Sequence, residues 1–312
     1  MKKSVYYRGK VGQYWYNFTE CLAYALLWRP TPDELIYTKH EQYGDGKLQY
    51  INTYCRKDAL DKKKPLFIYI HGGGWISGIT DMRNTYIKNW AKLGFYTSSI
   101  SYSYAPEKIF PSQLHEIFSA IDFILDKAEE NNVDTDNIVI SGESAGGYYI
   151  SFVAACAADP TLLDKLGISF RHRDTFKLKA MVSHCGCYDL KSMADPAKPQ
   201  SKFPDIRMMI SSFLGMPPDE ALEYLRSDEG AVCTPPITKG FPPVFITWCA
   251  QDKLRFEAFD VMKKFDELGI PYEQFKGDGI ISQHAWTIVT VFKKGKLCFE
   301  RAAEFVSKYV EM

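Results

Sequence analysis

From about residue 47 onward, short apolar runs alternate with stretches whose apolar residues recur at helical spacing. The runs Leu66–Ile70 and Val244–Cys249 have the length and composition of buried strands. Between 114 and 125 the apolar residues instead recur every three or four positions, as on one face of a helix. Such alternation requires a mostly parallel sheet with helices on both faces. The sequence therefore predicts an α/β protein, folded as a single domain over residues 1–312.

The same patterns predict the other elements of this domain. The expected strands are 95–101, 138–140, 179–183 and 272–275. The expected helices are 146–157, 256–268 and 297–309.

Two stretches interrupt the alternation, residues 1–45 and residues 190–240. Each carries apolar residues at helical spacing where no helix of the alternating pattern is expected. A connection as long as the second stretch is usually a functional lid or insert. We expect the two stretches to form a helical cap, although helices that simply enlarge the core would leave the same pattern.

The charge balance and the cysteines indicate which binding partners and which cellular compartment to expect. The chain has 38 basic and 38 acidic residues, so a nucleic acid is not an expected partner. Its eight cysteines lack paired zinc-ligand spacing and several lie in apolar runs, which favours buried free thiols over disulfides. The first residues lack the apolar region of a secretory signal, and the apolar patch Cys21–Trp28 is too short to span a bilayer. We therefore expect a cytoplasmic protein without stable membrane insertion.

The stretch Gly142-Glu143-Ser144-Ala145-Gly146 has the Gly-x-Ser-x-Gly pattern of a nucleophile elbow. In that motif, a sharp strand-to-helix turn holds a serine above the edge of the sheet. The pattern alone is weak evidence, but here it follows an expected strand and opens an expected helix, as the motif requires. Ser144 is therefore the expected nucleophile.

A serine nucleophile needs a histidine base and an acid that orients it, in the chain order serine, acid, histidine. His284 follows the last expected strand, where a base can reach over the sheet edge, whereas His184 ends a central strand and is expected to be structural. Asp252 follows another strand and is the preferred acid. Asp189 is an alternative, and Asp278 is disfavoured because it is close to His284 in sequence.

Three consecutive glycines follow the strand Leu66–Ile70 and His71. Glycine backbone can approach a substrate closely, and its N–H groups can stabilise the negative charge that develops on a carbonyl oxygen. We expect an oxyanion hole formed by the N–H groups of Gly72, Gly73 and Ala145. His71 is expected to stabilise the turn and not to act as a base.

Together these motifs resemble those of the hormone-sensitive-lipase-like esterases of the α/β-hydrolase superfamily, over most of residues 60–310. The matching segments are His71-Gly72-Gly73-Gly74-Trp75, Gly142-Glu143-Ser144-Ala145-Gly146-Gly147, Tyr102-Ser103-Tyr104-Ala105-Pro106-Glu107 with Phe110-Pro111, Asp252-Lys253-Leu254-Arg255-Phe256-Glu257 and His284-Ala285-Trp286. Two residues depart from the family pattern: Ser103 stands where the family usually has an arginine, and Phe256 stands where it has an acid.

The resemblance implies the α/β-hydrolase fold, a cap built from the N-terminal segment and an insert, and no metal or organic cofactor. In the family, the segment containing Glu107 is structural, so Glu107 is not a catalytic candidate. We expect Trp75, Met208, Met209 and Phe213 to line the pocket above Ser144.

The expected function is that of a serine carboxylesterase that hydrolyses short-chain or small aromatic esters, acetyl esters among them, through an acyl-enzyme. Two alternatives stay open: an arylformamidase-like amide hydrolase, whose His-Gly-Gly-x-Trp motif shares Trp75, and a non-catalytic ligand-binding relative, against which His284 argues. Weak membrane docking through Trp15, Phe18 and Leu22 is a further alternative. The sequence leaves the oligomeric state open, with a homodimer among the options.

Overall fold

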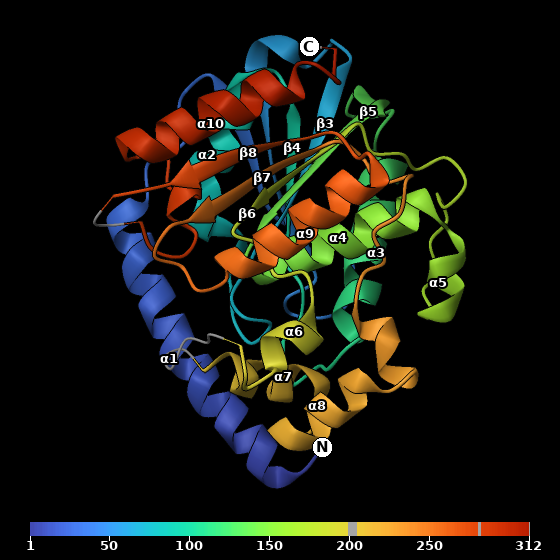
Figure 1. The fold of residues 1–312 in the computed structure, drawn as a ribbon. Helices are drawn as coiled ribbons and strands as arrows, with labels where there is room; N and C mark the ends of the chain where they lie inside the picture. Colours follow the sequence, from blue (N-terminus) through green and yellow to red (C-terminus); the bar gives the residue numbers. More distant parts are fainter. Residues whose placement is uncertain (199–204, 280–281, 312) are drawn as a thin grey trace.

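The computed structural model describes residues 1–198, 205–279 and 282–311, and its centre is a single twisted sheet (Figure 1). In this part of the chain the sheet has eight strands in the order β1-β2-β4-β3-β5-β6-β7-β8. The strands are β1 (Leu35–Gln42), β2 (Tyr50–Arg56), β3 (Lys64–Ile70), β4 (Tyr96–Ile100), β5 (Val133–Glu143), β6 (Ala180–His184), β7 (Val244–Cys249) and β8 (Tyr272–Gly277). From β4 to β8 all neighbours are parallel, while β1 and β2 are added antiparallel at one edge. The predicted mostly parallel sheet is confirmed.

Helices cover both faces of the sheet and one of its ends. They are α1 (Lys3–Leu27), α2 (Asn84–Lys92), α3 (Ser112–Asp126), α4 (Ala145–Ala158), α5 (Thr161–Lys165), α6 (Leu190–Ala194), α7 (Ile206–Leu214), α8 (Pro218–Arg226), α9 (Arg255–Leu268) and α10 (Lys293–Val306). Short 3-10 turns span Lys57–Ala59, Thr80–Arg83, Glu229–Cys233 and Trp286–Ile288. Every strand and helix expected from residue 60 onward is present, with ends shifted by a few residues.

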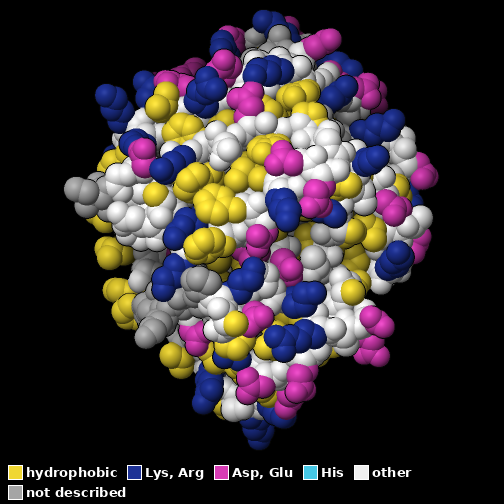
Figure 2. All heavy atoms as spheres, viewed as in Figure 1, with side chains coloured by type: hydrophobic (Ala, Val, Ile, Leu, Met, Phe, Trp, Pro, Cys, Tyr) yellow, Lys and Arg dark blue, Asp and Glu magenta, His cyan; other side chains and the backbone are white. Residues whose placement is uncertain are grey.

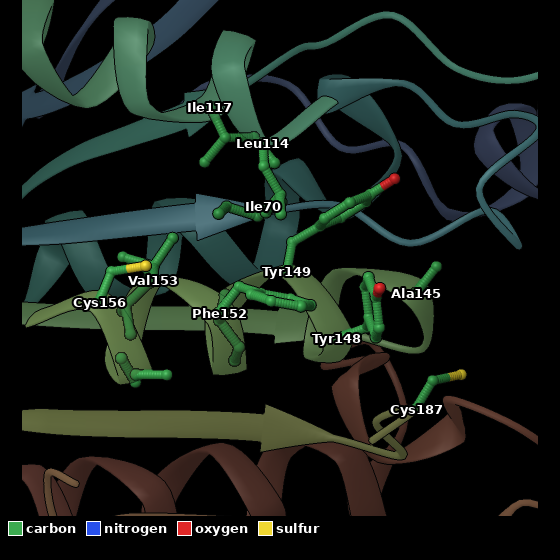
Figure 3. Packing of buried hydrophobic residues seen from close by; sticks show 14 of the residues in the cluster. Ile70, Leu114, Ile117, Ala145, Tyr148, Tyr149, Phe152, Val153, Cys156 and Cys187 are labelled. Atoms are coloured by element: carbon green, nitrogen blue, oxygen red, sulfur yellow. The ribbon is translucent and has the colours of Figure 1, made fainter. Parts of the chain in front are cut away.

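Strand β3 shows why the central strands are apolar throughout. Successive side chains of a strand point to opposite faces, so both faces must be covered for all of them to be buried. Ile68 and Ile70 pack in the cluster that contains α3, α4 and α9, whereas Phe67 and Tyr69 pack in the cluster with α2 and α10. Figure 3 shows Ile70 between Leu114 of α3 and the α4 side chains.

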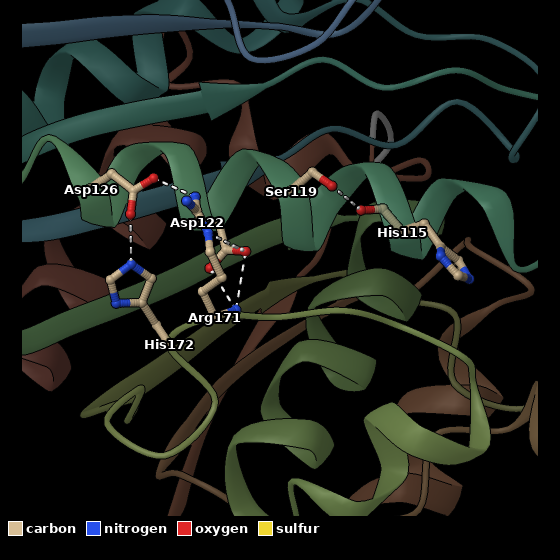
Figure 4. A network of polar contacts seen from close by, with 6 residues as sticks. All are labelled: His115, Ser119, Asp122, Asp126, Arg171 and His172. Atoms are coloured by element: carbon tan, nitrogen blue, oxygen red, sulfur yellow. Dashed lines mark hydrogen bonds and ion pairs between the residues drawn. The ribbon is translucent and has the colours of Figure 1, made fainter.

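A polar contact fastens α3 to the loop before β6 (Figure 4). Asp122 accepts hydrogen bonds from the backbone N–H of Arg171 at 3.1 and 3.2 Å. Asp126 pairs with the Arg171 guanidinium and, at 3.0 Å, with the His172 ring. Asp122 is buried and Asp126 is exposed, and we assign these contacts a structural role.

Four helices lie together at one end of the molecule in Figure 1: α1, α6, α7 and α8. Helix α7 contacts each of the other three, so the N-terminal segment and the insert form one layer. The expected boundary of the N-terminal part was wrong, because residues 35–42 form the edge strand β1 and not a cap element. In that strand only Leu35 is buried, and the three apolar residues 35–37 are followed by five polar ones, so the sequence lacks the longer apolar run of a buried strand.

Candidate active site

Ser144 occupies the turn between β5 and α4. Its backbone has φ 55° and ψ −122°, a conformation that non-glycine residues rarely adopt and that is found at functional sites. The turn depends on close backbone packing, since a Cβ on Gly146 would lie 2.2 Å from the carbonyl oxygen of Ile70. Ser144 therefore stands at the carboxyl end of a central strand and at the N-terminus of α4.

His284 and Asp252 form a hydrogen-bonded pair at the same edge of the sheet. The distance from His284 Nδ1 to Asp252 Oδ2 is 2.6 Å. A second carboxylate oxygen of Asp252 accepts the backbone N–H of Leu254 at 2.9 Å, which fixes the side chain. The Asp252 side chain is 7% exposed and that of His284 is 37% exposed, so the acid is shielded while the ring reaches solvent.

The pair changes the pKa values of both partners. Burial raises the pKa of Asp252, but the charge and hydrogen bond of His284 outweigh burial and bring that pKa below its usual 3.8. Burial lowers the pKa of His284, but the charge and hydrogen bond of Asp252 outweigh it, so that this pKa lies above 6.5. The pair is thus built to accept a proton on the histidine ring.

The other candidate acids and histidines are engaged elsewhere. Asp189 caps the N-terminus of α6, and Asp278 pairs with Lys294. His184 is fully buried and lies 3.0 Å from the Tyr86 hydroxyl, and its burial lowers its pKa to about 3. His71 is buried against the Tyr102 ring, and burial lowers its pKa to about 4, as suits a residue that stabilises the turn.

Ser144, Asp252 and His284 all line one cavity of about 210 Å³ at the carboxyl edge of the sheet. In the described part of the chain no hydrogen bond joins the Ser144 hydroxyl to the His284 ring. Such contacts are often long without substrate and tighten in the Michaelis complex. The structure thus brings the three residues chosen from sequence to one place.

The glycine run contributes a different pair of residues from the one expected. Gly73 and Gly74 line the cavity, whereas Gly72 does not. The Gly72 N–H is among the groups that lower the pKa of the buried Glu143 carboxyl, so it faces that carboxylate. Ala145 is the first residue of α4, where the N–H has no carbonyl within the helix to bond. The cavity lining favours Gly73 and Gly74 over the expected Gly72 as donors, whereas Ala145, which does not line the cavity either, stays a candidate because of its place in the first turn of α4.

Of the four residues expected to line the pocket, the structure places two at the cavity and two elsewhere. Trp75 and Met209 line the cavity, but Met208 and Phe213 do not. Phe213 is fully buried and stacks on the Trp75 ring at a centroid distance of 5.4 Å, so it supports the wall from behind. The periodicity of a helix shows that one face is apolar, but which neighbour that face meets depends on packing.

Several polar residues in the cavity were missed from sequence. Glu20 reaches it from the inner side of α1, and Arg83 from the turn before α2. Arg83 Nε lies 3.3 Å from Oε1 of Glu143. Glu20 Oε2 is buried and has no hydrogen-bond partner in the structure as described, and burial raises the pKa of this carboxyl to about 8. The only sequence signal was an isolated acid in an otherwise apolar part of the helix.

One group of potential metal ligands overlaps this site. Cys185, Asp252 and His284 place one ligand atom each within 4.8 Å of one another, among the residues described. Two ligands of a tetrahedral zinc ion each lie about 2.0–2.3 Å from the metal and so cannot be in direct contact. The 2.6 Å contact between Asp252 and His284 is therefore the geometry of an acid–base pair and not of a chelate.

The chain is similar to known hydrolases in sequence. It is 30% identical over 178 residues to the hormone-sensitive lipase of Mus musculus, covering 57% of this chain and 22% of that protein. It is 33% identical over 145 residues to the arylacetamide deacetylase of Bos taurus, covering 45% of this chain and 36% of that protein. The chain thus spans well under half the length of these curated relatives.

A solved structure of Esterase B from Lactobacillus rhamnosis superimposes on the chain with a TM-score of 0.81. The two are 16% identical, and the match covers 98% of this chain and 97% of that one. This likeness shows the α/β-hydrolase fold. The expected resemblance to the hormone-sensitive-lipase-like esterases is confirmed, and because the BD-FAE family model matches residues 52–255, the chain belongs to the BD-FAE family.

Proposed function

We propose that the chain is a serine carboxylesterase for small esters and that Ser144, His284 and Asp252 form its catalytic triad. The single observation that carries the proposal is the shared cavity. A serine on a strained elbow, a histidine bonded to a buried aspartate, and two glycine backbones all border the same space. The sequence relatives that are named as lipases and deacetylases support the same reaction class.

In the first half of the reaction, His284 Nε2 takes the proton of the Ser144 hydroxyl while Oγ attacks the ester carbonyl. Asp252 keeps the Nδ1 proton in place and stabilises the imidazolium that forms. The N–H groups of Gly73, Gly74 and Ala145 stabilise the oxyanion of the tetrahedral intermediate. Collapse of that intermediate breaks the ester C–O bond, and His284 passes its proton to the departing alcohol.

In the second half, water replaces the alcohol in the cavity. His284 removes a proton from this water, which attacks the acyl-enzyme carbonyl through a second oxyanion. The bond to Ser144 Oγ then breaks, the proton returns to Oγ from His284, and the carboxylic acid leaves. No step needs a metal or an organic cofactor.

Cavity size supports a small substrate. Pockets for drug-sized ligands occupy about 300–1,000 Å³, so a cavity of about 210 Å³ suits a short acyl group with a compact alcohol. Its walls are mostly apolar, with side chains from Trp75, Met193, Ile206, Met209, Leu254 and Phe256. We propose esters of short-chain or small aromatic acids, acetyl esters included.

The direct test is labelling with a fluorophosphonate, together with kinetics of Ser144→Ala. We expect stoichiometric labelling of Ser144, and we expect the variant to lose several orders of magnitude in kcat, because acylation has no other route. Ser119→Ala is the matched control, since Ser119 is exposed on α3 and its hydroxyl donates to the His115 carbonyl. Labelling at another serine, or normal turnover by Ser144→Ala, would contradict the proposal.

Amide hydrolysis is a second candidate, favoured by the likeness to arylacetamide deacetylase. The same residues could cleave an anilide, provided that His284 protonates the poorer leaving group. Phenyl acetate and acetanilide share the acyl group and the ring, so a side-by-side assay separates the two. An esterase would hydrolyse the anilide orders of magnitude more slowly.

A further inference from the structure

The outward face of α1 is apolar along nearly its whole length. Seven large side chains on this face are each at least 51% exposed, and we call them the α1 stripe: Tyr7, Val11, Tyr14, Trp15, Phe18, Leu22 and Leu26. Apart from the adjacent Tyr14 and Trp15, they recur every three or four residues, so they form one continuous band on the helix. In Figure 2, hydrophobic side chains appear along the left edge of the molecule, where Figure 1 places α1.

The inner face of the same helix is the more polar one. Gln13 is buried there and donates to the carbonyl of Ala105 at 3.2 Å, and Glu20 and Tyr16 line the cavity. A surface helix normally turns its apolar side to the core and its charged side to water. In α1 seven large apolar side chains face water instead, while Gln13 and Glu20 face inward, so the stripe is not explained by packing within the fold. An exposed apolar band of this size marks an interaction surface.

The charges on α1 indicate which kind of surface it meets. Its exposed charged residues are the bases Lys3 and Arg8, while its one acid, Glu20, lies on the inner face. Lys10 is paired with Glu107. A second copy of the chain would bring the same bases to the contact, without an acid from this helix to pair with them. An anionic lipid surface complements both the bases and the apolar stripe.

The composition of the stripe supports the same choice. Tyr and Trp side chains gather at membrane–water interfaces because each combines an apolar ring with a polar group, and Lys and Arg can extend their charges toward the headgroups. In the described part of the chain no helix is long and apolar enough to cross a membrane. We propose that the α1 stripe docks the protein on an anionic lipid surface, with α1 lying in the plane of the interface.

Docking through the α1 stripe would also fix the distance between the cavity and the lipid surface. The residues that α1 contributes to the cavity, Tyr16 and Glu20, lie on the side opposite the stripe. A helix with its side chains is about 10 Å across, so the cavity would lie roughly that distance from the headgroups. The docking surface is separate from Ser144 and its partners, and its test does not depend on the proposed esterase activity.

The test is co-sedimentation of the full chain with vesicles of phosphatidylcholine alone or with about 30 mol% phosphatidylglycerol. We expect binding to the anionic vesicles, weakened as NaCl rises from about 0.1 to about 0.5 M. The triple variant Val11→Gln/Phe18→Gln/Leu22→Gln should lower the partition coefficient about tenfold or more, because it removes apolar area from the interface. Gln keeps a good helix propensity at these exposed positions. Lys3→Gln/Arg8→Gln should lose the preference for anionic vesicles.

Leu60→Gln/Leu93→Gln/Leu297→Gln is the matched control, since these leucines are exposed away from α1 and should leave vesicle binding unchanged. Hydrolysis of a water-soluble ester should be the same in all variants. Absence of wild-type binding to anionic vesicles would overturn the proposal, as would equal binding by the stripe variant. A wild-type dimer that becomes a monomer in the stripe variant, without vesicle binding by either, would assign the face to a second copy instead.

Discussion

At the scale of single residues, the candidate chemistry depends on contrasts between neighbouring titratable groups. Asp252 and His284 share one hydrogen bond, and their pKa values move apart because each charge stabilises the other. Glu20 borders the same cavity, and there burial raises the pKa of its carboxyl to about 8, although the charge of Arg83 and the Ser77 hydroxyl lower it. Two acids in one cavity are thus expected to differ in charge near neutral pH, for reasons that lie in their contacts alone.

The raised pKa of His284 predicts the acid limb of the activity profile. The base must be neutral to take the proton of Ser144, so kcat/KM should fall as pH drops through a value above 6.5. The effect on the free energy of unfolding has the opposite sign. The ion pair of His284 with Asp252 stabilises the fold fully at pH values below the ordinary histidine pKa of 6.5, and this stabilisation is lost as the pH rises through the raised pKa of His284. Asp252→Asn should move the acid limb to lower pH and slow the reaction. A wild-type limb at pH 5, or one that Asp252→Asn leaves in place, would count against His284 as the base.

Glu20 predicts a pH dependence of stability. Its pKa is about 8 in the folded chain and near 4.5 in the unfolded chain, so folding becomes less favourable as pH rises from about 4.5 to 8. Glu20→Gln removes this penalty and should stabilise the protein at pH 8.5 by a few kcal/mol, at roughly 1.4 kcal/mol per pKa unit. At pH 4.5 the two proteins should unfold at nearly the same temperature.

Thermal unfolding at the two pH values measures this difference. Glu300→Gln is the control, because Glu300 is 56% exposed on α10 and should change little at either pH. An equal effect of Glu20→Gln at both pH values would show that the carboxyl is not held protonated.

At the scale of elements, the cavity is formed where strand ends meet helices α1, α6 and α7. The carboxyl ends of β3, β5 and β7 lead to the glycine run, Ser144 and Asp252, and the loop after β8 carries His284. Helix α7 supplies Met209, whose side chain lies close to Gly74, since a Cβ there would be 2.6 Å from the Met209 sulfur. Helix α7 therefore forms the part of the cavity wall next to Gly74.

Adjacent methionines on α7 allow a matched test of that role. Met209 lines the cavity and Met208 does not. Met209→Ala should shift the acyl-length optimum toward longer chains, with a gain of roughly fourfold per added methylene that finds room, from about 0.8 kcal/mol of transfer energy. Met208→Ala should leave the optimum unchanged. The measurement is kcat/KM across a p-nitrophenyl ester series, and equal shifts in both variants would contradict the placement of α7.

At the scale of the whole molecule, the carboxyl edge of the sheet and helices α1, α6 and α7 border a finite cavity of about 210 Å³ beside Ser144. In such a space, added methylenes improve binding only until the cavity is full, after which overpacking costs about 1–3 kcal/mol. We expect kcat/KM on p-nitrophenyl esters to peak between acetate and butyrate and to fall steeply for long chains. The same series with wild-type protein checks this, and a preference for long-chain triglyceride emulsions would contradict it.

The sequence alone was sufficient for the features that depend on neighbouring residues. The elbow at Ser144, the strand ends before Asp252 and His284, and the parallel sheet follow from local patterns, because a strand-to-helix turn and an apolar periodicity are properties of a short segment. These segments determined the candidate triad and the fold class.

Only the tertiary structure decided features that depend on contacts between distant segments. Gly73 and Gly74 border the cavity, whereas Gly72 faces the buried Glu143 carboxylate. The packing of α1 places Glu20 on the inner side and the α1 stripe on the outer side. The apolar periodicity of its sequence would instead predict that the stripe faces the core. Strand β1 is a strand because β2 pairs with it. In each case the residue's environment comes from a partner far away in the chain, and local propensity carries no information about that partner.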